Sequence, residues 1–286
     1  IDKVCRRGEY SGADVSRELP ITLGEALHHQ GRVDEAREAF ARAATVKRPA
    51  AFAASAWARE GLYLPSATLA SIGMEHQQAC VRFASTNAPA SRSHARLRLG
   101  FVSDHLHEHP VGYLVVRVLE ELAREHDLFV YGLRVARSSL ADRLAAAGVE
   151  WREPRSNADL VEAARNDELD VAFDLIGHGA GTRLGAFAAR LAPVQVAWAG
   201  YPATTGLPAM DVFLADARHV PPSAEPFYVE RVLRMPNAFI AWEPPPGATP
   251  SSSLAVERIG ALTLGSFHPP AALCAQTLDT FAAALQ

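Results

Sequence analysis

The spacing of apolar residues changes once along the chain, near residue 95. Residues 20–84 are rich in Ala, Leu, Glu and Arg and contain no β-branched run, which predicts a helical region. After residue 96, short apolar segments of strand length alternate with amphipathic segments of helical spacing. This alternation predicts an α/β fold, in which helices cover both faces of a mainly parallel, doubly wound sheet.

One stretch of the helical region fits a tetratricopeptide unit. Its offsets are occupied by Leu23, Gly24, Leu27, Gly31, Ala36, Phe40 and Ala43. In this interpretation Gly24 allows two helices to approach closely, Gly31 forms the turn, and Pro49 ends the second helix. A generic alanine-rich helical hairpin fits the same pattern. Because such repeats need about three neighbours for stability, either further repeats precede this one or it packs on the next domain.

The second part of the chain predicts a Rossmann-like domain over residues 96–241. Strands are expected over residues 97–102, 127–135, 149–152, 170–176, 194–199 and 211–216, and helices over residues 112–125, 138–147, 157–165 and 184–190. Segments 85–95 and 242–257 are rich in turn-forming residues and predict linkers. Residues 1–84 then form the helical region. In residues 258–286, one short strand and one helix predict the start of a second Rossmann-like domain.

Composition narrows the functional classes. The 286 residues are 49% hydrophobic and 21% charged, as in globular proteins of about two domains. A net charge of -4 argues against nucleic acid as a partner, and the lack of an 18-residue apolar run argues against a membrane-spanning helix. Cys5, Cys80 and Cys274 are scattered singly, which predicts no disulfide framework and no metal site, and suits the cytoplasm. The chain begins without Met, which indicates a piece of a longer product.

The first candidate site is the loop after the first expected strand. Ligands of parallel sheets bind outside the carboxyl ends of the strands, and this loop carries His105, His107 and His109 there. Histidine titrates near neutrality, so it can take a proton from a hydroxyl group. His109, held between Glu108 and Pro110, is the candidate general base. His105 and His107 are interpreted as surface residues.

Two further loops are candidates. In Gly177–Arg183 the glycines let backbone N–H groups approach a ligand, although such a pattern is more often a plain tight turn. Its spacing lacks the dinucleotide fingerprint, which argues against a nicotinamide or flavin oxidoreductase. In Trp198–Asp211, the rings of Trp198 and Tyr201 could stack on a sugar or peptide, and the hydroxyls of Thr204 and Thr205 could bind its polar groups. Structural packing of the loop is the alternative.

Four segments together resemble the catalytic half of O-GlcNAc transferases and their bacterial and plant relatives. They are LGFVSDHLHEHPVGY (Leu99–Tyr113), DLIGHGAGTRLGAFAARLAPVQVAWAGYPATTGLPAMD (Asp174–Asp211), EPFYVERVLRMPNAFIAWEPP (Glu225–Pro245) and GSFHPPAALCAQTLDTF (Gly265–Phe281). Their order, their spacing and the preceding tetratricopeptide unit fit the family, and the resemblance covers about residues 20–286. The segment APVQVAWAGYP is its most specific part.

The resemblance implies the first half of a GT-B glycosyltransferase. Family members transfer N-acetylglucosamine from UDP-GlcNAc to Ser or Thr of proteins, with inversion, without a metal and without a cofactor. The implied partners are therefore acceptor proteins, recruited by the helical repeat, and a nucleotide sugar. His109 falls on the histidine of the family's HP motif, which implies the general base. The substrate-binding positions implied are Pro110, His178, Gly200, Tyr201, Pro202, Thr204, Thr205 and Gly206.

The sequence departs from the family pattern at two places. Val212 stands where the family usually has Tyr after Met-Asp. In the last segment the family has FNxxxK, whose lysine contacts the donor phosphates, whereas this chain has His268 for the Asn and Ala272 for the Lys. An ammonium there would neutralise charge on the departing UDP, and alanine cannot. The alternative function is therefore a catalytically impaired relative that serves as a protein–protein interaction module. We also expect the isolated chain neither to transfer sugar nor to bind the donor tightly.

Overall fold

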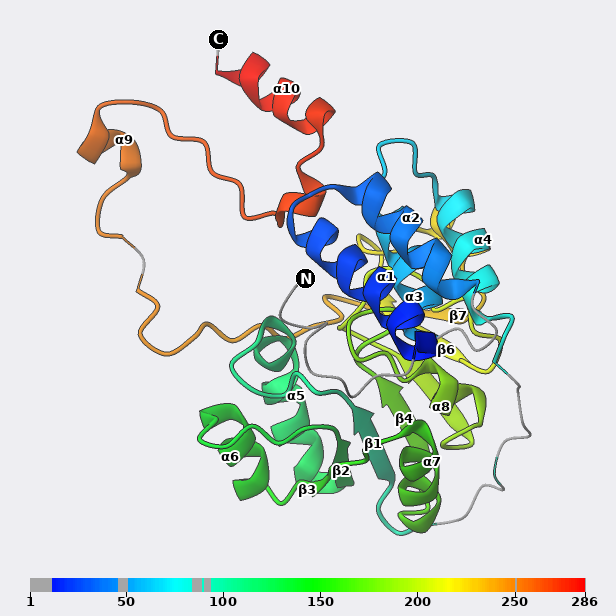
Figure 1. Ribbon diagram of the computed structural model, residues 1–286. Coiled ribbons are helices and arrows are strands. Elements are labelled where there is room, and N and C mark those ends of the chain that lie inside the picture. The colour runs from blue at the N-terminus through cyan, green and yellow to red at the C-terminus, as the bar shows by residue number, and fades with distance from the viewer. Residues whose placement is uncertain (1–11, 46–50, 84–88, 90–93, 250, 286) are drawn as a thin grey trace.

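The computed structural model describes residues 12–45, 51–83, 89, 94–249 and 251–285 (Figure 1). Cys5, Pro49 and most of the expected 85–95 linker lie outside the described residues. In the described part, four helices come first and a seven-stranded sheet follows. The expected order of a helical region followed by an α/β sheet is confirmed.

The helical region consists of two antiparallel helix pairs. The four helices are α1 (Gly12–His29), α2 (Val33–Ala44), α3 (Ala51–Gly61) and α4 (Leu69–Cys80). Phe40 of α2 is fully buried against α1 at Gly24, where a Cβ atom would lie 2.6 Å from the ring. Gly31 has a φ of 73° in the turn between α1 and α2, a conformation that favours glycine. The tetratricopeptide offsets therefore correspond to a close helix pair, as expected.

The sheet is parallel throughout. Its strands are β1 (Arg98–Val102), β2 (Asp127–Tyr131), β3 (Glu150–Arg152), β4 (Val171–Asp174), β5 (Val194–Ala197), β6 (Val212–Asp216) and β7 (Arg231–Met235). Their order is β3-β2-β1-β4-β5-β6-β7, and Gly100 of β1 pairs with Phe129 of β2 and Ala172 of β4. Strands β2 and β3 are added on one side of β1, and strands β4 to β7 on the other side, so the strand order reverses between β1 and β4. In such sheets this switch point is where ligands bind, at the carboxyl ends of the strands.

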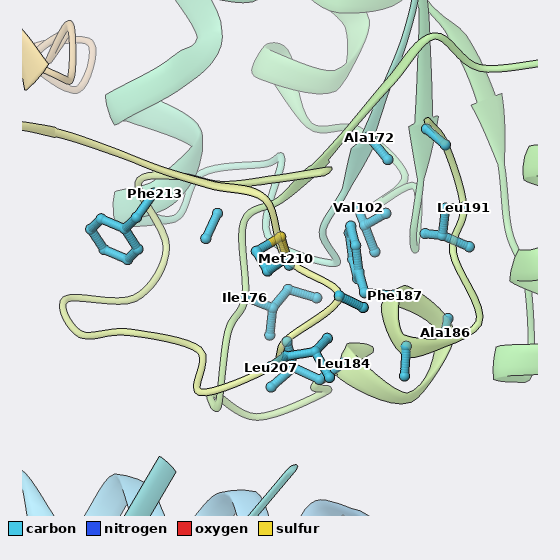
Figure 2. Close-up of a cluster of buried hydrophobic side chains, with 14 of the residues drawn as sticks. Val102, Ala172, Ile176, Leu184, Ala186, Phe187, Leu191, Leu207, Met210 and Phe213 are labelled. Atoms are coloured by element: carbon cyan, nitrogen blue, oxygen red, sulfur yellow. The ribbon is translucent and has the colours of Figure 1, made fainter. Parts of the chain in front are cut away.

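Two sets of helices sandwich the sheet. They are α5 (Pro110–Glu125), α6 (Ser139–Ala146), α7 (Asn157–Asn166) and α8 (Leu184–Ala188). Alternate residues of β1 divide between the faces: Phe101 packs with α5 and α6, and Val102 packs with α7 and α8. Figure 2 shows the second cluster, where Phe187 and Met210 fill the space beside Val102. The period of two along each strand thus gives two apolar cores.

Some boundaries differ from the sequence-based expectation. β2 ends at Tyr131 rather than 135, and β4 ends at Asp174 rather than 176. The Asp174 carboxylate accepts hydrogen bonds from the N–H groups of Ile176 and Gly177, so those groups are not available to the strand ladder. β7 was not predicted, because its segment alternates charged and apolar residues at an edge of the sheet.

The expected strand in residues 262–286 is wrong within the part of the chain that the structure describes. Helix α9 (Ala255–Ile259) precedes that segment, and the segment itself contains a 3-10 turn, η3 (Pro270–Ala272), and helix α10 (Ala275–Ala284). Leu262, Leu264 and Phe267 are exposed. A strand needs a neighbour for its backbone N–H and C=O groups, and no described strand lies beside these residues.

No helix among the described residues is long and apolar enough to cross a membrane.

We predict that Phe40→Ala destabilises the helical region by about 3–5 kcal/mol, because it removes a buried ring and leaves a cavity. Leu23→Ala is the control, since this side chain is exposed, and should cost less than about 0.5 kcal/mol. Urea unfolding followed by circular dichroism measures both. Equal losses for the two variants would contradict the assigned core.

Candidate active site at the carboxyl edge of the sheet

The loop after β1 is fixed at the switch point by its own side chains. The Ser103 hydroxyl accepts a hydrogen bond from the His105 N–H at 3.0 Å, and Asp104 accepts one from the Leu133 N–H at 2.7 Å. Glu108 accepts two hydrogen bonds from Ser139 at the start of α6, which lowers the pKa of Glu108 to about 2. The loop is therefore tied to β2 and α6, so the histidines that it carries have defined positions.

His109 forms the N-cap of α5. Its Nδ1 accepts a hydrogen bond from the Val111 N–H at 3.2 Å, and Pro110 occupies the first turn. The ring is half-buried and stacks on His105 with centroids 4.2 Å apart. Burial, followed by the neighbouring His105 and His107, lowers the pKa of His109 to about 4. His109 is thus neutral at pH 7, with its proton on Nε2 while Nδ1 caps the helix.

The loop after β4 places His178 in the interior. His178 is fully buried, and its Nε2 lies 2.7 Å from the Thr205 carbonyl oxygen. Because a carbonyl only accepts, Nε2 carries the proton, and the Nδ1 lone pair has no hydrogen-bond partner. Burial lowers the pKa of His178 to about 3, so the ring is neutral. Gly177 has a φ of 57° and lies against Tyr201, where a Cβ atom would lie 2.4 Å from the Tyr201 Cβ.

The loop after β5 is held by a buried carboxylate. Glu230, which is 4% exposed, accepts hydrogen bonds from the Thr204 hydroxyl at 2.6 Å and the Thr205 N–H at 2.7 Å. The Thr205 hydroxyl also donates to it. On the other side of the loop, the Tyr201 hydroxyl lies 2.7 Å from Nε2 of His76 on α4. The loop is therefore anchored both to the start of β7 and to the helical region.

These contacts correct part of the interpretation from sequence. Tyr201, Thr204, Thr205 and His178 are buried and bind other groups of the protein, so in this structure they do not present a surface for stacking or hydroxyl binding. Trp198 is likewise buried, and its Nε1 donates to the Phe239 carbonyl. The reason is that groups inside the protein supply the partners: Glu230 binds both threonines, and His76 of α4 binds Tyr201.

The glycines of the loop are also explained by packing. A Cβ at Gly200 would lie 1.6 Å from the Leu175 carbonyl oxygen, and one at Gly206 would lie 2.2 Å from the His76 backbone. Pro202 is exposed, Gly200 is half-buried, and Pro110 of the first loop is exposed. Together with the half-buried ring of His109, these three positions are the parts of the predicted site that reach solvent at the carboxyl edge.

Three residues of this region were missed from the sequence. His76 lies on a helix with no motif around it, and Asp174 reads as the end of a strand. Glu230 belongs to the quoted segment EPFYVER, which was the available signal. Burial raises the pKa of Asp174 to about 6, with a smaller effect from the charge of Glu230. The role of a buried polar residue follows from its hydrogen-bond partners, and a single sequence does not show which distant residues those partners are.

The structure also describes Ala272, where the resemblance implies a lysine. Ala272 is half-buried and lines a pocket of about 480 Å³ between the turn after α3 and helix α10, together with Tyr63 and Thr277. Arg183, the cation of the Gly177–Arg183 loop, donates to the Pro154 carbonyl at 3.4 Å. In the described residues, no three His, Cys, Asp or Glu side chains are placed to hold a metal ion.

The fold and the position of the histidine loop define the class of protein. A helical region precedes a parallel sheet of Rossmann strand order, with the candidate base at its switch point, as in the first half of a GT-B glycosyltransferase. Residues 65–243 match the sequence profile of glycosyl transferase family 41. The chain belongs to this family, which confirms the resemblance.

Individual relatives agree with the family. The chain is 34% identical over 197 residues to the "Probable UDP-N-acetylglucosamine--peptide N-acetylglucosaminyltransferase SPINDLY" of Solanum lycopersicum, covering 65% of this chain and 21% of the relative. It is 30% identical over 154 residues to the UDP-N-acetylglucosamine--peptide N-acetylglucosaminyltransferase of Caenorhabditis elegans, covering 50% of this chain and 13% of the relative. The chain thus spans about a fifth or less of the length of these curated relatives.

A solved structure is similar as well. The K341M mutant of the O-GlcNAc transferase of Thermobaculum terrenum matches with a TM-score of 0.73 and 31% identity. The match covers 81% of this chain and 46% of that one. The similarity therefore extends over most of this chain.

We predict that His178 makes stability depend on pH in the acid range. Its folded pKa of about 3 lies below the ordinary value of 6.5, so between these values the unfolded state binds more protons. Its contribution is complete above about pH 6.5 and is lost as pH falls toward 3. From about 1.36 kcal/mol per pKa unit, lowering pH from 7 to 5 should cost wild type roughly 2 kcal/mol more than His178→Phe. Urea unfolding at both pH values measures the difference. A difference that does not change with pH would contradict the assigned protonation state.

Proposed function

We propose that this chain supplies the acceptor side of an inverting, metal-independent glycosyltransferase that moves N-acetylglucosamine from UDP-GlcNAc to Ser or Thr hydroxyls of proteins. The observation that carries the proposal is His109, a neutral imidazole at the switch point of a family 41 sheet. The names of the relatives support the donor and the peptide acceptor. No cofactor is needed, because the nucleotide sugar itself carries the group transferred.

The proposed reaction is a single displacement. The acceptor oxygen forms a bond to the anomeric carbon while the bond from that carbon to the UDP phosphate oxygen breaks, which inverts the configuration. The hydroxyl proton passes to His109, and UDP leaves with the electron pair. Because His109 is neutral at pH 7, one ring nitrogen is able to accept this proton. If Nε2 is the accepting atom, the proton of neutral His109 must lie on Nδ1, so the hydrogen bond from Val111 must open.

The helical region gives the proposed enzyme its second binding surface. We assign α1–α4 to recruitment of the protein acceptor, since they pack directly beside the loop after β5 through α4. Nucleic acid is not proposed as a partner, given the net charge of -4. We place the protein in the cytoplasm, where the free thiols of Cys80 and Cys274 remain reduced.

One observation favours a second function. Ala272 stands where the resemblance implies a phosphate-binding lysine. Alanine has no ammonium group, so it cannot neutralise the charge of the leaving UDP. A relative without transferase activity would retain the helical region and the α/β domain as a protein-binding module. Turnover by the full-length protein, compared with its Ala272→Lys variant, separates the two functions: activity that appears only with the lysine favours the binding module.

We predict that His109→Asn in the full-length protein lowers kcat by about 10²- to 10⁴-fold, the usual range for loss of a general base. Asparagine still caps the helix, so stability should change little, whereas His109→Ala loses the cap as well. His107→Ala is the control and should retain activity within about threefold, since His107 is not assigned to proton transfer. Transfer to a Ser-containing acceptor protein, followed by mass spectrometry, measures turnover. Unchanged turnover in His109→Asn would rule out the base role.

We predict that residues 1–286 bind UDP-GlcNAc more weakly than about 10 μM, which corresponds to about 7 kcal/mol. The two phosphates need cations or a helix N-terminus, and the implied lysine position is Ala272. Isothermal titration calorimetry of the chain with UDP-GlcNAc measures the affinity, with the Arg183→Ala variant as control for the Gly177–Arg183 loop. Tighter binding that is lost in Arg183→Ala would place the phosphates in that loop instead.

A further inference from the structure

Helix α4 makes three independent contacts with the loop Trp198–Gly206. The His76 ring is hydrogen bonded to Tyr201, the Cys80 thiol donates to the Thr205 carbonyl at 3.2 Å, and the α4 backbone lies against Gly206. These contacts join residues about 125 positions apart. The loop is therefore enclosed by a helix that comes before the sheet in sequence.

The direction of the central hydrogen bond follows from its neighbours. His76 Nδ1 lies 2.7 Å from the Ile72 carbonyl oxygen, which can only accept, so Nδ1 carries the proton. Burial lowers the pKa of His76 to about 4, so Nε2 is unprotonated at neutral pH. Tyr201 therefore donates its hydroxyl proton to His76 Nε2 at 2.7 Å. Phenylalanine at either position cannot make this bond.

The buried side chains around His76 include one unsatisfied hydrogen-bond acceptor, which packing alone does not require. His178 lies edge-on to His76 with ring centroids 4.7 Å apart, and its buried Nδ1 has no hydrogen-bond partner. An unsatisfied buried acceptor destabilises the folded state, and a functional role is one reason for a protein to keep such a group. The same loop presents Gly200 and Pro202 at the carboxyl end of β5, on the same edge of the sheet as His109 but two strands away from β1.

We propose that His76 is a positioning residue of the proposed enzyme: through Tyr201 it holds the loop Trp198–Gly206 in the conformation that receives the protein acceptor. The inference rests on the proposed function. It makes the helical region part of the acceptor site through α4, in addition to its proposed role in recruitment. His76 itself touches no reacting atom.

The test uses the full-length protein and two readouts. The first is amide hydrogen exchange of the loop, measured by mass spectrometry without any substrate. His76→Phe and Tyr201→Phe should each speed exchange of residues 198–206 by about tenfold, and the double variant should not exceed the larger single effect, because both remove one bond. His76→Gln keeps an acceptor near the Nε2 position and should restore much of the protection.

A matched control separates positioning from general destabilisation. Tyr131→Phe removes the same atom from another buried tyrosine, whose hydroxyl donates at 2.7 Å to Asp167 at the end of α7. It should leave exchange of the 198–206 loop unchanged. Equal acceleration in Tyr131→Phe, or no acceleration in His76→Phe, overturns the proposal.

The second readout is steady-state transfer with varied acceptor. His76→Phe and Tyr201→Phe should raise the acceptor KM about three- to tenfold and leave the KM for UDP-GlcNAc unchanged, and His76→Gln should restore the acceptor KM. Faster exchange with unchanged kinetics would show that the bond holds the loop without positioning the acceptor, and overturns the proposal. If wild type transfers no sugar, the proposed function fails, and with it the acceptor role. The exchange readout then still decides whether His76 holds the loop.

Discussion

A carboxylate in the protein interior, that of Glu230, determines much of the structure around the carboxyl edge. Moving a charged or polar group from water into the interior is costly unless hydrogen bonds replace its hydration. Here Thr204 and Thr205 supply those hydrogen bonds, and to do so the chain after β5 must turn inward. That turn carries Tyr201 toward α4, where His76 is its partner. One buried group thus links the start of β7, the loop and the helical region.

The neutral state of the histidines follows from the same cost of placing a charged group in the protein interior. His76 and His178 are each fixed in one tautomer by a backbone carbonyl, and burial keeps both uncharged. His109 differs in degree: its ring is only half-buried, and burial, followed by the neighbouring His105 and His107, lowers its pKa. Its low pKa weakens it as a base in the free protein. A nearby anion, such as the phosphates of a bound nucleotide, would raise that pKa toward the value that proton transfer requires.

The fold could be predicted from the sequence because its signals are local. The switch from helical to alternating pattern near residue 95, and the strand-to-helix loop that carries His109, depend only on neighbouring residues. The side-chain roles at the second loop could not be predicted in this way. Tyr201 and Thr204 look like ligand-binding residues in a turn-rich loop, and only the covering helix α4 and the distant Glu230 show that they face inward. The strand expected after residue 261 failed for a related reason, since a strand depends on a partner that local pattern does not reveal.

The close approach of Gly206 to α4 bears on where this protein can be divided. The linker at residues 85–95 looks like the natural boundary between the helices and the sheet, yet α4 lies before it and packs on the sheet side at two glycines. Gly206 meets the His76 backbone, and Gly73 of α4 meets the Phe227 carbonyl oxygen. A cut at the linker would expose both surfaces and leave Tyr201 and the Thr205 carbonyl without their α4 partners. The smallest part that keeps the loop enclosed therefore begins before Thr68, the residue that caps α4, so the unit that folds together is larger than the unit that the change in sequence pattern marks.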